Sequence, residues 1–448
     1  MKAILTLLFP YAICATSPVF GQQANPDSLA KEIKEIKKDL GTLPHLKITG
    51  WVQTQFQYVK TRGAASYEGG NFSPNSDKRF MIRRGRIKFT YNGKNTQHVI
   101  QMNGSERGVN LVEMYSTITD PWVKAFSITA GVMNRPFGFE IDQSSSVRES
   151  PERSRYTQIL MPNERDLGAK IVIAPGKKSK LYGLRVDAGM YNGQGIYVPG
   201  TSAPAGYANG TTPMLGVNEF DFGKDFIGRF SYYKSLKDEK YKFGLGVSHY
   251  NGGNIYSTNM VYRKLITDEV TGNKIWLPVD STQTPLKNRV APRVYYGAEA
   301  FFSMNTKLGT TTLRGEYITG TQPGTSSNSA SPFFQPAAGA TYVRKFNGMY
   351  AYFIQRIAKT KHEVVLKYEW YDPNTEVSGK EITGTGANAL SAADIKYTQL
   401  GLGYNYYYDT NVKFMFYYNL ISNESTGIAA YNKDLKDNVF TFRIQYKF

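Results

Sequence analysis

Cysteine, histidine and long apolar runs are scarce in this chain of 448 residues. The single cysteine, Cys14, lies in an apolar N-terminal stretch, so the rest of the chain has no disulfide and no thiolate chemistry. Only four histidines are present, and neither a metal-ligand spacing nor a phosphate-binding loop appears. Beyond the N-terminal stretch no apolar run is long enough for a membrane helix, and the mean hydropathy is −0.41. These absences argue against the common enzyme classes and against a helical membrane protein.

The N-terminus has the pattern of an export signal. "MKAILTLLFPYAICATSPVFGQ" places Lys2 before an apolar stretch that ends in small residues, which predicts a secretory signal peptide over residues 1–21. Residues 22–45 are predicted to form a short amphipathic helix on the periplasmic side. This helix either pairs in a coiled coil or lies alone on a membrane surface, because its apolar residues recur at spacings of four and three. They are Leu29, Ile33, Ile36, Leu40 and Leu43.

Aromatic residues are abundant, with 33 Tyr and 25 Phe, and they recur at a period of two. In "FTFRIQYKF" (440–448), apolar residues alternate with Thr441, Arg443, Gln445 and Lys447. Successive side chains of a strand point to opposite faces, so one face of this strand is aromatic and the other is polar. The same pattern predicts about sixteen strands, near 46–58, 80–91, 97–103, 111–119, 126–132, 167–174, 181–191, 226–234, 241–250, 292–303, 310–319, 347–356, 362–371, 396–408, 411–420 and 438–448.

The connections between these strands alternate between short turns and long loops. Long connections are expected near 60–79, 104–110, 133–166, 192–225, 251–291, 320–345, 372–395 and 421–437. This rhythm is typical of a transmembrane antiparallel β-barrel with periplasmic turns and extracellular loops. The sequence therefore predicts an all-β protein whose residues 46–448 form a barrel in the outer membrane of a Gram-negative bacterium. We expect the last strand to close on the first, and Phe448 to serve as the recognition signal for the barrel assembly machinery.

Two other architectures are compatible with part of the pattern. A soluble β-sandwich explains the alternation but not the rhythm of turns and loops. A barrel lipase or protease would use the neighbouring Ser248 and His249, but adjacent strand residues point to opposite faces, and a catalytic base must reach its nucleophile. Neither architecture accounts for the whole pattern, and we expect no enzymatic activity.

The face predicted to line the lumen is rich in cations. "RRGRIKF" (83–89) is its densest part. Rings of Arg and Lys in a pore favour anions, and the planar fork of Arg suits oxyanions. In the alternative interpretation, these charges only solvate a wide lumen or balance carboxylates. The predicted inward cations are Lys47, Arg84, Arg86, Lys88, Lys170, Arg185, Arg229, Lys242, Arg314, Lys367, Lys413, Arg443 and Lys447. The predicted inward anions are Glu113, Asp187, Glu299, Glu316, Glu363 and Glu369.

The segment 133–166 is too long for a hairpin and has no strand pattern. We expect it to fold into the lumen as a long third loop, or else to form an extracellular lid or a latch between subunits. Its charge nearly cancels, so an anion preference requires that the two signs be separated in space. Its charged residues are Arg135, Arg148, Arg153, Arg155, Arg165, Glu140, Asp142, Glu149, Glu152 and Glu164.

Several segments together resemble one family of porins. "RRGRIKFTYNG", "VNLVEMYSTITD", "ITAGVMNRPFGFE", "SPERSRYTQILMPNERDLGAKI" and the aromatic terminus are similar to the phosphate-selective porin O and P family, in a form typical of Bacteroidota. The likeness is clearest over residues 46–190, with the third-loop markers running from Gly131 to Gly168. It implies a sixteen-stranded barrel, usually trimeric, with an inward third loop and cationic side chains along an anion path.

From these observations we expect a porin through which small solutes diffuse passively, with a preference for anions such as phosphate or polyphosphate-like oxyanions. The expected partners are small anions, outer-membrane lipid or lipopolysaccharide, and two further copies of the chain in a homotrimer; no nucleic acid, cofactor or metal is expected. The alternative is a binding or adhesion barrel with a plugged lumen. The candidate pore-lining residues are Arg84, Arg86, Lys88, Arg135, Arg153, Arg155, Arg165, Arg185, Arg314 and Arg443.

Overall fold

In the computed structural model, antiparallel strands form a closed β-barrel. The structure describes residues 45–197, 216–217, 223–236, 239–282, 284–330 and 339–448. The predicted signal peptide, 1–21, and nearly all of the predicted helix, 22–45, lie outside the described residues.

The described part of the main sheet contains 18 strands, and removing the hairpin β12–β13 leaves the sixteen strands of the barrel (18 − 2). This confirms the predicted architecture. The barrel strands are β1 (Leu46–Val59), β2 (Lys78–Asn92), β3 (Thr96–Ser105), β4 (Gly108–Thr119), β5 (Phe126–Asn134), β6 (Arg165–Ile173), β7 (Leu184–Tyr191), β10 (Asp225–Leu236), β11 (Tyr241–Ile255), β14 (Val290–Thr306), β15 (Gly309–Gly324), β16 (Thr341–Ile357), β17 (His362–Asp372), β18 (Tyr397–Tyr407), β19 (Val412–Asn423) and β20 (Val439–Lys447).

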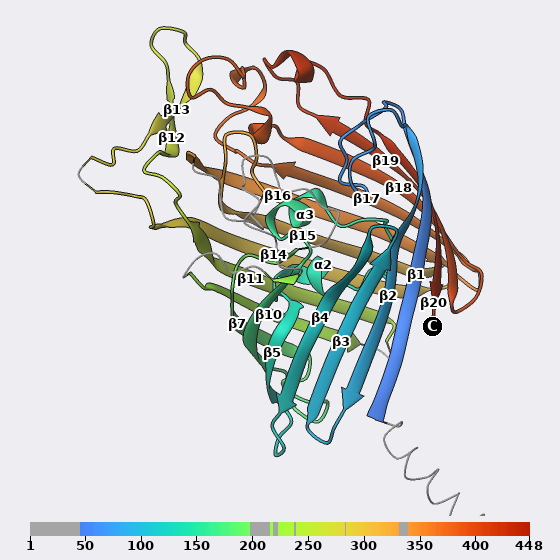
Figure 1. Cartoon of the computed structure of the whole chain (residues 1–448). Helices are drawn as coiled ribbons and strands as arrows, with labels where there is room; N and C mark the ends of the chain where they lie inside the picture. Colours follow the sequence, from blue (N-terminus) through green and yellow to red (C-terminus); the bar gives the residue numbers. More distant parts are fainter. Residues whose placement is uncertain (1–44, 198–215, 218–222, 237–238, 283, 331–338) are drawn as a thin grey trace, which may run out of the picture. The chain divides into compact units, whose positions relative to one another are not determined.

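The barrel closes where the last strand pairs with the first (Figure 1). β20 runs antiparallel to β1, with Trp51 opposite Lys447 and Val59 opposite Val439. Beyond this ladder, Gly50 and Phe448 exchange two backbone hydrogen bonds, each of 3.0 Å. Closure matters because an unpaired backbone group costs several kcal/mol in hydrocarbon, and a closed sheet has no edge.

The barrel wall buries polar side chains and exposes apolar ones. Along β17, Glu363, Lys367 and Glu369 are buried in the lumen, whereas Leu366 and Tyr368 on the alternate face are more than 40% exposed. A soluble sheet shows the opposite distribution, because water favours polar groups outside. The outward apolar face is the surface that a membrane barrel presents to lipid.

Short turns gather at one end of the barrel and long loops at the other. The turns β2–β3, β4–β5 and β14–β15 lie at the end where β1 begins and β20 ends (Figure 1). One expectation is wrong: the connection near 104–110 is not a long loop, because β3 and β4 are joined by only two residues, Glu106 and Arg107. Gly108 permits this tight turn by adopting a positive φ of 123°.

The loop end carries additional secondary structure. These elements are β8 (Ile196–Tyr197), β9 (Gly216–Val217), β12 (Val261–Thr267), β13 (Lys274–Pro278) and the single 3₁₀ turns η2 (Gly379–Glu381), η3 (Ala392–Asp394) and η4 (Ala429–Tyr431). The hairpin β12–β13 joins the barrel through a short parallel pairing of β12 with β16. A cluster of buried aromatic and aliphatic side chains, including Trp276 and Tyr342, stabilises this end. In the described part of the chain, no helix has the length and apolar character needed to cross a lipid bilayer.

Candidate functional site

The segment between β5 and β6, residues 135–164, lies inside the barrel (Figure 1). It contains two short helices, α2 (Gly138–Asp142) and α3 (Arg155–Leu160). α2 contacts β11, β14 and β15, and α3 contacts β17. None of these strands neighbours β5 or β6 in the sheet, so the segment crosses the lumen to the far wall. We call residues 135–164 the lumen segment.

α2 is fixed on Glu316 of β15. The Oε2 atom of Glu316 accepts the backbone N–H groups of Phe139 (2.8 Å) and Glu140 (3.2 Å), and the hydroxyl of Tyr156 donates to Oε1 (2.7 Å). Gly138 makes this approach possible. Its φ is +64°, and a Cβ atom there would lie 2.2 Å from Oε1 of Glu316. Only glycine fits this position without displacing the carboxylate.

Glu152 connects the lumen segment to the seam of the barrel. Its carboxylate is buried and forms ion pairs with Arg83 (2.8 Å) and Arg84 (2.8 Å) of β2 and with Arg443 (2.9 Å) of β20. Arg83 and Arg84 are consecutive residues, yet both side chains reach Glu152 in the lumen. The inward–outward alternation of β2, in which Ile82 points outward, is therefore interrupted here. A buried carboxylate with three arginines forms strong, charge-assisted hydrogen bonds.

Three other carboxylates of the lumen segment, those of Asp142, Glu149 and Glu164, also pair with arginines. Glu149 pairs with Arg314 of β15 at 2.9 Å. The remaining pairs are Asp142 with Arg229, and Glu164 with both Arg153 and Arg165. At the base of the segment, Arg135 pairs with the buried Asp166 of β6 at 3.3 Å. Arg229 and Arg314 tie the lumen segment to the wall, whereas the pairs of Arg135, Arg153 and Arg165 tie parts of the segment and its base to one another.

Two further arginines lie against aromatic rings. The guanidinium of Arg155 is 3.4 Å from the ring centroid of Tyr397 and 4.5 Å from that of Tyr67. The guanidinium of Arg86 is 5.8 Å from the ring centroid of Trp51, which faces the lumen. Cation–π contacts of this kind orient a cation without neutralising it.

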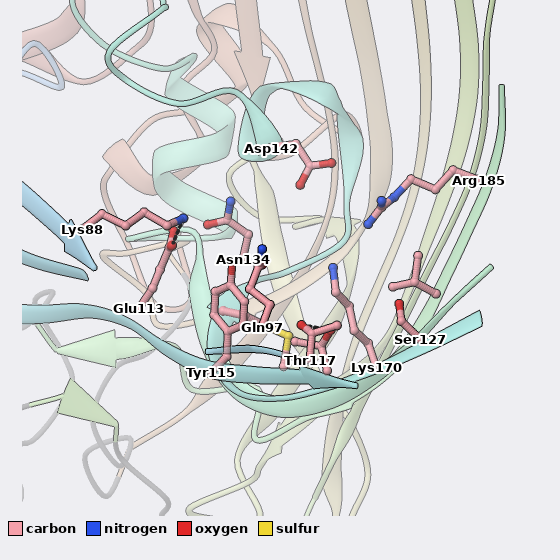
Figure 2. A pocket seen from close by; sticks show the side chains of 13 residues that line it. Lys88, Gln97, Glu113, Tyr115, Thr117, Ser127, Asn134, Asp142, Lys170 and Arg185 are labelled. Atoms are coloured by element: carbon pink, nitrogen blue, oxygen red, sulfur yellow. Dashed lines mark hydrogen bonds and ion pairs between the residues drawn. The ribbon is translucent and has the colours of Figure 1, made fainter. Parts of the chain in front are cut away.

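A polar cavity of about 320 Å³ remains between the lumen segment and the wall formed by β2 to β7. Figure 2 shows Lys88, Lys170 and Arg185 pointing into it from the wall, with Asp142 on the opposite side. Its lining comes from the six consecutive strands β2 to β7 and from the segment itself. The lining residues are Lys88, Gln97, Glu113, Tyr115, Thr117, Ser127, Thr129, Met133, Asn134, Asp142, Lys170, Val172 and Arg185.

The cations of this cavity are more accessible than the wall carboxylates beside them. Lys88 lies 3.1 Å from Glu113, and the side chains are 29% and 8% exposed. Arg185 and Lys170 share Asp187, at 2.6 Å and 3.0 Å, and the Arg185 side chain is 42% exposed whereas Asp187 is 3% exposed. A solute in the cavity therefore meets ammonium and guanidinium groups on this wall. The accessible carboxylate among the lining residues is Asp142.

The structure separates the ten candidate residues into three groups. Lys88 and Arg185 line the cavity, and Arg86 and Arg155 lie against aromatic rings. The other six form ion pairs with carboxylates: Arg84, Arg135, Arg153, Arg165, Arg314 and Arg443. Lys170, a predicted inward cation outside these ten candidates, also lines the cavity. Its position beside Arg185 and Asp187 depends on how β6 pairs with β7, and the sequence of a single strand does not give this pairing.

Ser248 and His249, the residue pair that a barrel hydrolase would use, lie on opposite faces of the wall. Ser248 faces the lumen, where its hydroxyl accepts the N–H of Gly138 at 3.0 Å. His249 lies on the outer face, stacked on Tyr296 at a centroid distance of 4.9 Å. Among the described residues, no group of three or more His, Cys, Asp or Glu side chains is arranged to hold a metal ion.

Comparison with known proteins finds partial structural similarity and no similarity in sequence. No family model matches the chain, and no curated protein is similar to it in sequence. Solved outer-membrane proteins are similar in structure. They include the channel DcaP of Acinetobacter baumannii (TM-score 0.49, 11% identity, 90% of this chain and 97% of that chain covered), the anion-selective porin from Comamonas acidovorans (0.47, 13%, 90% and 99%) and OprB of Pseudomonas putida (0.48, 10%, 93% and 97%).

Likeness at this level carries no argument about which solute passes. The fold assignment stands on the strand pairing described above. The resemblance of the sequence to the phosphate-selective porin O and P family stays a prediction.

Proposed function

We propose that this chain is an outer-membrane porin that lets small solutes diffuse passively and prefers anions. The observation that carries the proposal is the polar cavity beside β2 to β7, which Lys88, Lys170 and Arg185 line and where Lys88 and Arg185 keep part of their surface exposed. A pore lined by such groups lowers the electrostatic barrier for anions and raises it for cations. Nε and Nη2 of Arg185 already bind the two oxygens of Asp187, so Arg185 attracts oxyanions of the phosphate and polyphosphate type through its permanent charge.

The sequence and the outer face of the barrel also support a membrane location, export and assembly for this chain. The outward apolar face fits a bilayer, so lipid or lipopolysaccharide surrounds the barrel. The chain is exported through its signal peptide and enters the outer membrane of a Gram-negative bacterium, with Phe448 recognised by the barrel assembly machinery. It assembles as a homotrimer, as the family that it resembles usually does.

A planar bilayer with a KCl gradient tests the anion preference directly. We compare the unaltered chain with the triple variant Lys88→Gln, Lys170→Gln and Arg185→Gln. The unaltered channel is expected to give a reversal potential set mainly by chloride. The triple variant is expected to give a reversal potential close to that of a non-selective pore. The matched control removes the same charge from exposed loop lysines, through Lys264→Gln, Lys287→Gln and Lys436→Gln. An equal shift in the control, or none in the triple variant, contradicts the proposal.

The same bilayer identifies the preferred anion. Added phosphate, pyrophosphate or an organic acid is expected to reduce the chloride current if it occupies the cavity, and the triple variant is expected to lose this block. A block by oxyanions that is no stronger than that by monovalent halides would restrict the proposal to a general anion preference.

A binding or adhesion barrel is the second candidate, and one observation favours it. The lumen segment contacts strands on the far side of the barrel and fills much of the lumen. A barrel plugged in this way would present its long loops as a receptor. Near-zero single-channel conductance of the folded chain would support this function over the porin.

A further inference from the structure

Lysines gather in the tight turns at the end of the barrel opposite the long loops. These turns join β2 to β3, β4 to β5, β6 to β7, and β14 to β15. Their exposed lysines are Lys94, Lys124, Lys177, Lys178, Lys180 and Lys307. A cationic surface of this kind has no part in the path through the lumen, since these side chains lie outside the strands that line it.

The carboxylate of Asp120, in the turn between β4 and β5, is bound by backbone groups of its own turn. Asp120 accepts five backbone N–H groups of its own turn, from residue 122 to residue 126, at 2.8–3.2 Å. These hydrogen bonds favour the ionised form and lower the pKa of Asp120. Asp120 therefore acts as the organiser of a turn, and its charge is directed to backbone donors. In these four turns, the charges that are not bound by backbone donors of their own turn are those of the lysines.

Large apolar side chains stand beside the lysines. Trp122 (87% exposed) and Val123 (65%) precede Lys124, and Leu308 (78%) follows Lys307. Leu181, also exposed, follows Lys180. Turns that face only water favour small polar residues, so exposed tryptophan and leucine at the tips need another explanation. Apolar side chains next to cations are typical of segments that lie at the interface of a bilayer.

We propose that this end of the barrel binds anionic phospholipid headgroups. The lysine ammonium groups donate to headgroup phosphates, and Trp122 and Leu308 insert between the acyl chains at the level of the glycerol backbone. Each lysine close to an anionic lipid surface strengthens binding about five-fold at low salt, and the effect fades as ions screen it. An anionic polysaccharide or peptidoglycan also attracts lysines, but it offers no apolar layer for the tryptophan and leucine tips. The combination therefore favours lipid.

Lipid retention by the purified full chain tests this proposal. The barrel is reconstituted into vesicles containing equal amounts of phosphatidylglycerol and phosphatidylethanolamine, extracted in mild detergent at low ionic strength, and the retained phospholipids are quantified by mass spectrometry. We expect a several-fold enrichment of phosphatidylglycerol that disappears at high salt. Replacing the six turn lysines with glutamine is expected to abolish the enrichment.

A matched variant separates location from net charge. It replaces six exposed lysines at the loop end, Lys60, Lys78, Lys264, Lys287, Lys433 and Lys436, with glutamine and should retain the enrichment. The double variant Trp122→Ser and Leu308→Ser keeps every charge and is expected to retain several-fold less phospholipid of both kinds. The heat-dependent shift in gel migration, measured for all variants, shows whether each barrel is folded.

Three outcomes overturn the proposal. One is equal retention of both phospholipids by the unaltered chain, and another is an equal loss of enrichment in the loop-end variant. The third is lysine-dependent sedimentation with isolated peptidoglycan in the absence of any lipid preference. None of these outcomes depends on whether the lumen conducts anions.

Discussion

The two sides of the lumen use the same kind of side chain for different purposes. On the side formed by β14 to β20, β1 and the part of β2 that carries Arg83 and Arg84, inward arginines are buried against carboxylates of the lumen segment. On the side formed by the rest of β2, from Lys88 onward, and by β3 to β7, Lys88 and Arg185 keep part of their surface in an open cavity. We call these the packed side and the open side.

An inward cation is therefore not by itself a selectivity residue. What matters is whether a carboxylate from another part of the chain reaches it and excludes water. On the packed side one carboxylate, Glu152, is surrounded by three arginines and has almost no exposed surface. On the open side each wall carboxylate is also shared, but it lies beneath the cations. Their nitrogen atoms therefore remain within reach of a solute.

The largest expected effect comes from breaking the packed side at Glu152. The change Glu152→Gln leaves Arg83, Arg84 and Arg443 without their counter-charge in a buried place. Removing one partner of a buried ion pair costs about 3–5 kcal/mol. We expect the lumen segment to detach, so that single-channel conductance and current noise both rise and the barrel unfolds at a lower temperature in detergent.

The control for this variant is an exposed ion pair in a turn. Glu239 pairs with Lys242 at 3.1 Å, and the glutamate side chain is 72% exposed. Because water already solvates it, Glu239→Gln should leave conductance and thermal unfolding unchanged. If Glu152→Gln also left conductance and thermal unfolding unchanged, the ion pairs of the packed side would not hold the lumen segment.

A smaller effect is expected from removing a carboxylate on the open side. Glu113 lies 3.1 Å from Lys88 and 3.0 Å from Arg165, so Glu113→Gln adds one net positive charge beside the cavity. We expect the reversal potential in a KCl gradient to move further toward that of chloride. The change Glu149→Gln adds the same charge on the packed side, next to Arg314, and is expected to alter current noise more than selectivity. Equal selectivity shifts for both variants would remove the distinction between the two sides.

The strands were predictable because alternation is a local property. Each strand carries its own pattern of apolar and polar residues, so all sixteen predicted ranges overlap barrel strands of the structure. The exceptions are local irregularities that the pattern does not encode. The turn at Glu106 and Arg107 is far shorter than expected, and Arg83 and Arg84 both reach the lumen although neighbouring strand residues normally diverge.

The partners of the charges were not predictable, because they are far apart in the chain. Glu152 and Arg443 are separated by 291 residues, and nothing in either neighbourhood shows that they meet. The balanced charge of residues 133–166 was visible in the sequence, as was the row of cations in "RRGRIKF". Which carboxylate meets which arginine depends on how the lumen segment crosses the barrel. The cavity is what remains after these pairs have formed.

The smallest expected effect is a pH dependence at the loop between β1 and β2, which reaches the packed side. Glu68 of this loop is buried, and its Oε1 accepts a hydrogen bond from Gln399 at 3.0 Å. Burial raises its pKa to about 7; Lys367 opposes this rise, and the nearby Glu152 adds to it. The folded loop therefore favours the protonated carboxyl. The protonated carboxyl of Glu68 contributes fully to the stability of the folded loop below about pH 4.5, and this contribution is lost as the pH rises through about 7.

Limited proteolysis of the intact barrel between pH 5 and pH 8 measures this loss. We expect cleavage within residues 60–77 to become several-fold faster as the pH rises, after correction for the protease's own pH profile on an unfolded substrate. The variant Glu68→Gln keeps the hydrogen-bonding capacity without a titrating group, so its cleavage rate should not vary with pH. Cleavage within the β12–β13 hairpin, far from Glu68, serves as the internal reference. A pH-independent rate in the unaltered chain, or the same rise in Glu68→Gln, would show that the packed side does not hold this loop through a buried carboxyl.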